Sequence, residues 1–254
     1  PLFSRCLARQ CREILAALGD GEILELGAGT GIMAADILRE LRALDALPER
    51  YAILELSGEL RERQRQTLVE RAPDLLQRVT WLDALPEPGL RGVILGNEVL
   101  DALPVERFRI TPRGPRRLEV TWAEAAPSTG AGTGLDWAEG AEDPAVTAAV
   151  ARIEAELGWR LPDGYASEYA PRLEEWLRAI AEPLAAGALL FVDYGYPRRD
   201  YYHPERAAGT LLCHYRHRVH DDPLILPGIQ DITASVDFTA VADAALAAGL
   251  EVAG

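Results

Sequence analysis

The sequence contains no lysine, and all 26 of its positively charged residues are arginine. Aspartate and glutamate outnumber them at 40, which gives a formal net charge of −14 at pH 7. Such an excess of negative charge argues against a large phosphate-binding face and against non-specific nucleic-acid binding. Cysteine is scarce as well. Cys6, Cys11 and Cys213 are an odd set without the tight spacing of a CxxC site, which indicates a reduced, cytoplasmic setting.

Long hydrophobic runs are missing too. No apolar stretch approaches the roughly 18 residues that span a bilayer, so no membrane partner is expected. The first residues, PLFSRCLARQCREIL, lack the basic and apolar pattern of a secretory signal and instead have the periodicity of an amphipathic helix that starts abruptly. Hydrophobic residues still make up 48% of the chain, which suffices for a core. We expect one domain, residues 1–254, truncated at both ends.

Short apolar runs alternate with helical patterns along the first hundred residues. This alternation predicts βαβ units and a mostly parallel sheet with helices on both faces. The expected strands are 22–26, 51–56, 79–84 and 92–98, and the expected helices are 3–18, 32–44 and 57–72, the last with Ser57 as its N-cap.

The pattern changes after this point. We predict a hairpin over 105–124 with a Pro-Gly turn, followed by a mobile loop over 122–142. Two helices follow, over 143–157 and over 169–187, and the second stops at Gly187. We then expect a fifth strand over 188–196, a long loop over 195–236, a helix over 237–250 with Asp237 as its N-cap, and the start of another strand over 251–254. The fold class is therefore a Rossmann-like open α/β sheet with an insertion, residues 105–186, between strands four and five. We interpret this insertion as a substrate-side subdomain.

The stretch ILELGAGTGIM, residues 23–33, places three glycines directly after the first expected strand. Gly27, Gly29 and Gly31 follow a GxGxG pattern, whereas dinucleotide-binding loops read GxGxxG. Ile32 stands where the third dinucleotide glycine would be, which argues against NAD or FAD. The pattern suits a close backbone approach to a nucleoside that carries an amino-acid tail. A tight strand-to-helix turn without a ligand is the structural alternative.

Acidic residues follow the next two expected strands. Glu55 ends the run YAILEL, where a carboxylate can accept two hydrogen bonds from a ribose diol. Asp83, in TWLDALP, could accept from an exocyclic adenine amine, and a turn cap is an equal alternative. Because the carboxyl ends of parallel strands share one sheet edge, these acids and the glycine loop are expected to lie together.

Polar residues also follow strands four and five. Asn97, Glu98 and Asp101 cluster in GNEVLDALPVERF, and Asp193 precedes Tyr194 in FVDYGY. A capped short helix at Asp101 and a structural role for Asp193 are the alternatives. Four histidines lie within one stretch, but their spacing fits no common zinc pattern, so no metal is predicted; they are His203, His214, His217 and His220.

These motifs, in this order, resemble the MidA-like family of class I S-adenosylmethionine-dependent methyltransferases, which includes the mitochondrial complex I assembly-factor methyltransferases. The matching pieces cover most of the chain, and NEVLDALPV and DITASVDF are the most specific of them. Two departures are Ala28 and Gly58, at positions where the family often has proline. Neither removes a ligand group.

The resemblance implies a methyltransferase with S-adenosylmethionine as cofactor and a protein substrate. Eukaryotic members are associated with symmetric dimethylation of an arginine in a complex I subunit. The resemblance implies a cytoplasmic protein if bacterial, or a mitochondrial matrix protein if eukaryotic. The sequence does not determine the oligomeric state, and a homodimer is one of the states that it allows. The cofactor-binding residues would be Glu25, Gly27, Ala28, Gly29, Gly31, Glu55, Leu56, Asp83, Ala84 and Asn97. The catalytic residues would be Asn97, Glu98, Asp101 and Asp193.

Two other functions stay open from the sequence. A non-catalytic assembly factor could keep the nucleoside pocket and work by binding a partner. A nucleotide-dependent oxidoreductase on a Rossmann sheet is the other, although the GxGxG spacing argues against it.

Overall fold

A computed structural model describes residues 2–122, 134–216 and 218–253 of the chain. The chain divides into two compact units. The first comprises Pro1–Val99 and Trp176–Asp193, and the second comprises Leu100–Glu175 and Tyr194–Gly254. The prediction of a single domain with an insertion over 105–186 stays a prediction.

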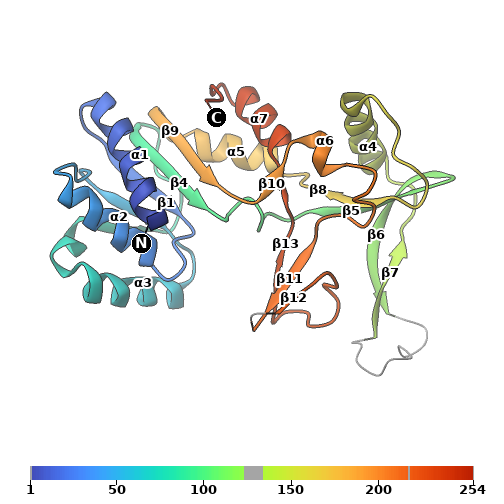
Figure 1. Ribbon diagram of the computed structural model, residues 1–254, viewed down its shortest axis with the longest axis horizontal. Helices are drawn as coiled ribbons and strands as arrows, with labels where there is room; N and C mark the ends of the chain where they lie inside the picture. The colour runs from blue at the N-terminus through green and yellow to red at the C-terminus, as the bar shows by residue number, and fades with distance from the viewer. Residues whose placement is uncertain (1, 123–133, 217, 254) are drawn as a thin grey trace. The chain divides into compact units, whose positions relative to one another are not determined.

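The first unit is built on a five-stranded, wholly parallel sheet in the order β3-β2-β1-β4-β9. Figure 1 labels β1, β4 and β9 of this sheet. The first four strands lie close to the predicted positions. Each is short and apolar, as expected of strands buried on both faces. The strands are β1 (Glu22–Leu26), β2 (Tyr51–Leu54), β3 (Val79–Leu82), β4 (Leu90–Asn97) and β9 (Leu184–Val192).

Side chains alternate between the two faces of this sheet, and helices cover both. One face, with Ile23, Tyr51 and Val93, packs against three helices, and the other, with Leu24 and Ile94, packs against a fourth. The predicted α/β sheet with helices on both faces is thereby confirmed. The helices are α1 (Leu2–Leu18), α2 (Ile32–Ala43) and α3 (Gly58–Arg71) on one side and α5 (Leu173–Ala181) on the other, with a 3-10 helix η1 (Pro73–Arg78) after α3.

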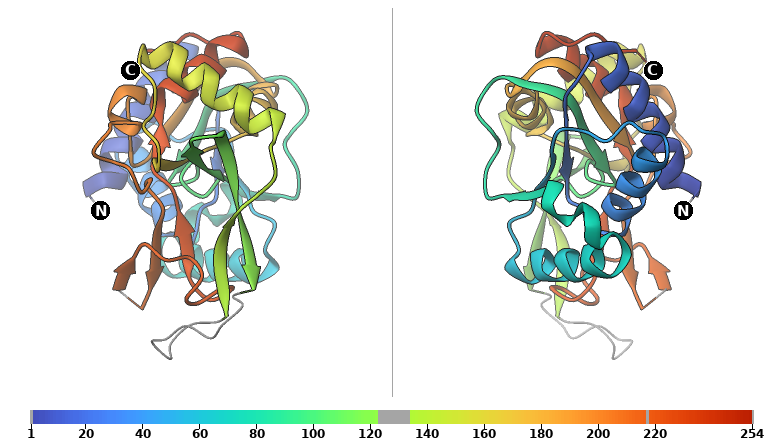
Figure 2. Two further views of the ribbon diagram at one scale, coloured as in Figure 1. Left: turned by 90° about the vertical axis from the view of Figure 1, so that its right-hand side faces the viewer. Right: turned by 90° about the vertical axis from the view of Figure 1, so that its left-hand side faces the viewer.

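The second unit contains an antiparallel sheet in the order β7-β6-β5-β8. Its β5–β6 hairpin confirms the predicted one, with Thr111 paired to Gly114 across the turn. Helix α4 packs on β6, as the left view of Figure 2 shows, and begins at the predicted position with Asp143 as N-cap. The elements are β5 (Glu106–Thr111), β6 (Gly114–Trp122), β7 (Leu135–Glu139), α4 (Pro144–Leu157) and β8 (Ala166–Tyr169).

Three predicted loops or ends need comment. Of the loop predicted over 122–142, residues 123–133 lie outside the described residues, and 135–139 form a strand because they pair with β6. The long loop predicted over 195–236 instead contains strands of two small sheets, β12-β11-β13 and β10-β14. Strands such as β11 and β13 are separated in sequence, so their pairing cannot be seen in a local pattern. Residues 251–253 form no strand. The elements are β10 (Gly195–Tyr196), α6 (Arg198–Tyr201), β11 (Leu212–Tyr215), β12 (Arg218–His220), β13 (Asp231–Thr233), β14 (Val236–Asp237) and α7 (Phe238–Ala247).

Gly187 does not stop a helix, and this prediction was wrong. Helix α5 ends at Ala181, two residues before Pro183, because proline lacks an N–H and restricts the residue before it. Gly187 lies inside β9, opposite Gly92 of β4, with a φ of +137°. A side chain on Gly187 would overlap the carbonyl oxygen of Gly92, so the glycine permits close approach of two strands.

The helix caps predicted at Ser57 and Asp237 are confirmed. The Ser57 Oγ accepts from the N–H of Leu60 at 3.3 Å, and the Asp237 carboxylate accepts from the N–H groups of Thr239 and Ala240 in α7. The three cysteines are free thiols. Within the described ranges, no helix is both long and apolar enough to cross a bilayer.

Candidate methyl-donor site

The carboxyl ends of the first unit's strands carry the residues that the sequence singled out. The glycine loop follows β1, Glu55 follows β2 by one residue, Asp83 follows β3, and Asn97 ends β4. All four strands are parallel, so these positions share one sheet edge. This is where open α/β sheets bind ligands.

The glycine loop adopts a backbone that other residues avoid. Gly27, Gly29 and Gly31 have φ values of +61°, +52° and +80°, all in the left-handed region. A Cβ on Gly31 would come within 3.0 Å of the Gln64 Cα, whereas a Cβ on Gly29 would meet nothing within 4 Å. Gly31 therefore allows α3 to pack against the loop, and Gly29 faces open space that a ligand can enter. Ala28, between Gly27 and Gly29, is buried.

Glu55 is held at both carboxylate oxygens. Its Oε1 accepts from the N–H of Ser57 at 2.9 Å, and its Oε2 accepts from Gln64 Nε2 at 3.1 Å. A carboxylate has about four acceptor positions, so each oxygen can still accept a further hydrogen bond. The side chain of Glu55 is thus oriented by the protein and keeps the capacity that a ribose diol would need.

Asp83 is tied to the same helix through Arg61. Arg61 donates from Nη2 to Asp83 Oδ1 at 2.6 Å and to the carbonyl of Leu82 at 2.8 Å, and from Nε to the carbonyl of Glu55 at 2.6 Å. Arg61 therefore links the ends of β2 and β3. Asp83, Leu56 and Ala84 are exposed, and Leu56 is the most exposed large apolar side chain in the described residues, at 79%.

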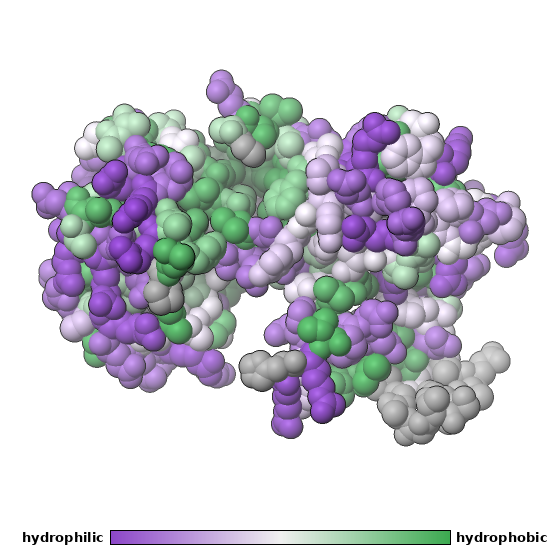
Figure 3. Space-filling model, in the orientation of Figure 1, coloured by the Kyte–Doolittle hydropathy of each residue, from purple (hydrophilic) through white to green (hydrophobic). Residues whose placement is uncertain are grey.

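Gln64 is the residue of this site that sequence reasoning missed. It is fully buried and joins the Gly29 carbonyl, Glu55 and Trp81. Helix α3 is polar along its length and shows no marked apolar stripe; Figure 3 shows the corresponding surface as largely hydrophilic. The one available signal was the spacing of Gln64 four residues before the buried Leu68, which places both on one helix face.

Asn97, Glu98 and Asp193 also lie at this sheet edge. Asn97 pairs in register with Val192, which immediately precedes Asp193, and the Glu98 N–H donates to the Val192 carbonyl at 2.9 Å. Glu98 has a φ of +51°, which a residue with a side chain adopts at a cost of roughly 1–2 kcal/mol. Such strain is often found at functional positions. The exposed carboxylate of Glu98 is consistent with that interpretation.

Glu25 lies within β1 and is completely buried, so it does not line the open edge. Tyr51 donates to its Oε2 at 2.7 Å, while its Oε1 has no partner. Burial raises the pKa of Glu25 from 4.5 to about 7, despite the opposing hydrogen bond from Tyr51. Burial, with Glu25 nearby, also raises the pKa of the Cys11 thiol to about 12, so this thiol stays protonated.

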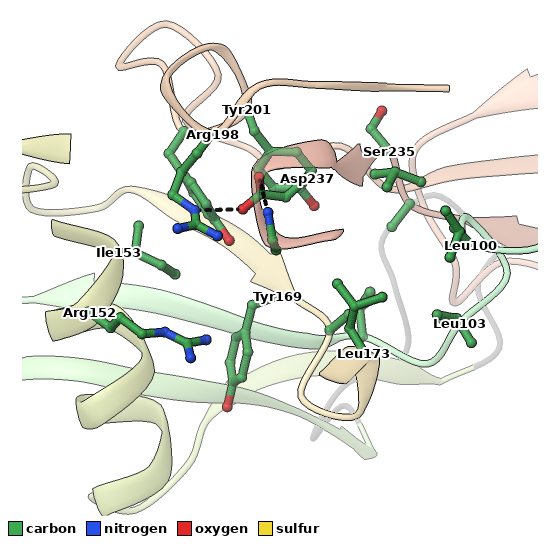
Figure 4. A pocket seen from close by; sticks show the side chains of 16 residues that line it. Leu100, Leu103, Arg152, Ile153, Tyr169, Leu173, Arg198, Tyr201, Ser235 and Asp237 are labelled. Carbon is green, nitrogen blue, oxygen red and sulfur yellow. Dashed lines mark hydrogen bonds and ion pairs between the residues drawn. The ribbon is translucent and has the colours of Figure 1, made fainter. Parts of the chain in front are cut away.

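Asp101, predicted beside Asn97 and Glu98, belongs to the second unit. Its carbonyl accepts from the Ala234 N–H at 3.0 Å, which joins the NEVLDALPV motif to the DITASVDF motif. Residues of both motifs and of SEYAPRL line one cavity, shown in Figure 4. They include Leu100, Leu103, Tyr169, Leu173, Ser235 and Asp237.

A second cavity of about 420 Å³ adjoins the first and shares Arg152, Tyr169 and Arg198 with it. Arg198 is buried and pairs with Asp237 at 2.9 Å, with Asp243 at 3.1 Å and with Glu156. Three carboxylates around one guanidinium leave this part of the second unit with an excess of negative charge.

Metal binding finds no support in the described part of the chain, where no cluster of three His, Cys, Asp or Glu side chains could hold an ion. His214 and His220 lie on the paired strands β11 and β12, His203 lies outside any strand, and His217 is outside the described residues.

Similarity to known proteins extends over almost the whole chain. The family described as "Putative S-adenosyl-L-methionine-dependent methyltransferase" matches residues 6–254. A protein from Burkholderia thailandensis, solved with bound S-adenosyl-homocysteine, is 44% identical and superposes with a TM-score of 0.87 over 98% of this chain and 61% of its own. A native structure from the same organism, also 44% identical, gives a TM-score of 0.86 over 98% of this chain and 63% of its own.

The chain is also similar in sequence to curated proteins. The mitochondrial protein arginine methyltransferase NDUFAF7 of Mus musculus is 30% identical over 86% of this chain and 50% of its own length, and that of Homo sapiens is 29% identical over the same shares. The chain thus spans about half the length of these relatives. Because the family match covers nearly every residue, the chain belongs to this family of S-adenosyl-L-methionine-dependent methyltransferases.

Proposed function

We propose that this protein transfers the methyl group of S-adenosylmethionine to an arginine side chain of a protein. The observation that carries the proposal is the glycine loop joined to Glu55, in a chain that matches an S-adenosyl-homocysteine-bound structure over 98% of its length. The curated relatives are named protein arginine methyltransferases, which supports the choice of acceptor.

The residues at the sheet edge fit this cofactor. A Cβ on Gly29 would meet nothing within 4 Å, so a ligand can approach the backbone closely there. The methionyl part of S-adenosylmethionine would lie in this space. Glu55 would accept from the ribose, Asp83 would accept from the adenine amine, and Leu56 with Ala84 would cover the adenine ring. Asn97 would face the methionine end. The bound cofactor supplies an electrophilic methyl on a sulfonium, and the protein supplies orientation and charge.

Alanine in place of Glu55 is expected to weaken S-adenosyl-homocysteine binding by about tenfold or more, because the ribose loses its acceptor; tenfold corresponds to about 1.4 kcal/mol. Calorimetric titration of the chain measures this. Glu59→Ala is the matched control, since Glu59 is an exposed glutamate of α3 that pairs with Arg63. Equal affinities for the two variants would remove Glu55 from the site. No binding by the unsubstituted protein would favour a non-catalytic binding factor or another ligand.

The acceptor side of the proposal rests on carboxylates. A guanidinium is cationic and hydrogen-bonds bidentately to carboxylates, which would align one nitrogen toward the methyl group and take its proton. Glu98 and Asp193 at the sheet edge and Asp101 in the second unit are our candidates. The larger cavity of the second unit, in which carboxylates outnumber arginines, is a candidate for contacts with the substrate protein.

Glu98→Gln is expected to lower methyl transfer by about 100-fold, in the range typical of a lost general base. The assay uses labelled S-adenosylmethionine and arginine-containing peptides, with the same peptides carrying lysine instead as the acceptor control. Methylarginine identified by mass spectrometry supports the proposal. Transfer to lysine peptides alone would contradict the arginine assignment, and unchanged turnover of Glu98→Gln would remove Glu98 from catalysis. A protein partner, a homodimer and a cytoplasmic location stay predictions.

A further inference from the structure

Gln64 is a fully buried polar side chain on a helix that otherwise buries only Leu68. Its amide makes three hydrogen bonds. Nε2 donates to the Gly29 carbonyl at 3.0 Å and to Glu55 Oε2 at 3.1 Å, and Oε1 accepts from Trp81 Nε1 at 2.9 Å. A buried amide whose donors and acceptor are all matched costs little stability, whereas an unmatched one carries the full penalty of losing its water.

The orientation of this amide is determined by its neighbours. The Trp81 indole can only donate, so it must face the Gln64 oxygen. The Gly29 carbonyl and the Glu55 carboxylate accept hydrogen bonds, so both must face the nitrogen. A glutamate here would lack the two donors, and a leucine would lack all three hydrogen bonds. Glutamine therefore fits this position through its hydrogen-bonding pattern as well as its size.

The groups that Gln64 joins come from two parts of the proposed donor site. Gly29 belongs to the loop after β1, and Glu55 follows β2. The packing leaves no spare room, because a Cβ on Gly31 would already lie 3.0 Å from the Gln64 Cα. One amide nitrogen thus fixes the distance between the loop that would hold the methionyl part and the carboxylate that would hold the ribose.

We propose that Gln64 is a positioning residue of the methyl-donor site. It orients the Glu55 carboxylate and the Gly29 carbonyl relative to each other, so that the two ends of the donor are bound at once. This inference rests on the proposed roles of Glu55 and the glycine loop. Gln64 itself would not touch the donor; it acts through Glu55 and the loop.

Gln64→Glu tests the proposal with an almost unchanged side-chain shape. At pH 8 the new carboxylate would lie beside Glu55, and the repulsion and lost donors are expected to weaken S-adenosylhomocysteine binding at least tenfold. Toward pH 6 the two carboxyls can share one proton, so part of the affinity is expected to return. The other charged groups nearby are Arg61 and Asp83, which pair, and Arg65, which lies 4.6 Å from the Trp81 ring centroid.

Gln66→Glu is the matched control. Gln66 lies on the same helix, is exposed, and donates to Glu62 at 3.1 Å, so the same substitution creates a like-charged pair away from the loop. Glu25 also titrates near pH 7, but it is present in both variants. The ratio of their affinities at each pH therefore isolates Gln64. A ratio of about one at pH 8 and at pH 6 would overturn the proposal.

Two further variants keep the test decisive if Gln64→Glu fails to fold, which thermal melting would reveal. Gln64→Leu is expected to lose affinity at least tenfold without recovery at pH 6, because it carries no charge. Trp81→Phe keeps a ring but frees the amide to rotate, and a several-fold loss is expected. The inference would be overturned if Trp81→Phe and one of the two Gln64 variants, each measured separately, both bound S-adenosylhomocysteine with normal affinity. If Glu55→Ala loses affinity and these variants do not, only the role of Gln64 fails; if the unsubstituted chain does not bind, both proposals fail.

Discussion

Glutamine in place of Glu25 is expected to raise the free energy of unfolding by about 3 kcal/mol at pH 8 and to leave it unchanged at pH 4. Burial in the core raises the pKa of Glu25 from 4.5 to about 7. The folded protein therefore holds this proton more tightly than the unfolded chain does. The stabilising contribution of the protonated form is complete below about pH 4.5 and is lost as the pH rises to about 7.

Glutamine is neutral at every pH, so this loss should disappear in the variant. Its amide oxygen can still accept from the Tyr51 hydroxyl, which keeps the one hydrogen bond of Glu25. Denaturant unfolding of both proteins between pH 4 and pH 8 measures the effect. Glu87→Gln, at an exposed position, is the control and should follow the unsubstituted protein. If Glu25→Gln also follows it at every pH, the carboxyl is not buried as described.

Ligand binding by the unsubstituted protein and by Glu25→Gln tests whether this destabilising carboxyl, two residues before Gly27, has a function. The unpartnered Oε1 of Glu25 is consistent with a functional group retained at a cost in stability. Glu25 does not line the open edge, but it precedes the glycine loop by two residues. We therefore expect Glu25→Gln to bind S-adenosyl-homocysteine more weakly through a change in that loop, although it is the more stable protein.

Alanine in place of Gly187 is expected to destabilise the first unit by more than about 4 kcal/mol, or to prevent folding. Two effects add. The φ of +137° is one that a residue with a side chain rarely adopts, and the new Cβ would overlap the Gly92 carbonyl oxygen of the neighbouring strand. Relief would require β9 and β4 to separate within a ladder that runs from Leu184 to Val192.

Gly158→Ala separates these two effects. Gly158 also has a positive φ, +78°, at the end of α4, but a Cβ there would meet nothing within 4 Å. Only the backbone strain remains, so a cost of about 1 kcal/mol is expected. Urea unfolding of both variants gives the comparison. Similar losses at the two positions would show that the sheet yields without cost and would contradict our account of Gly187.

The sheet was predictable because its strands are short apolar runs that each end at a polar or glycine residue. Glu22–Leu26 and its loop are one such case, and Leu90–Asn97 is another. Ser57 and Asp237 could be identified as caps because capping depends on neighbouring residues only. Local patterns therefore predicted the first four strands of the sheet and the sheet edge where the candidate site lies.

The errors arose where distant segments decide the structure. Glycine ends many helices, and this local rule predicts a helix end at Gly187. The role of Gly187 in the structure depends instead on Gly92, which lies in a strand that is distant in sequence. Strand β11 pairs with β13 from Asp231 onward, across a stretch without local strand signals. Gln64 resembles its polar neighbours in α3 and differs only in what it contacts.

The division of the chain has a consequence for how the protein forms during synthesis. Strand β4 lies between β1 and β9 in the finished sheet, but residues 98–183 are made before β9 begins. Until then the hydrogen-bonding groups along one side of β4 have no partner strand. An unpaired strand edge can join another chain, and β4 is apolar enough to do so. Until Leu184–Val192 has been made and has paired with β4, the emerging polypeptide therefore carries an apolar strand edge that is open to misassembly.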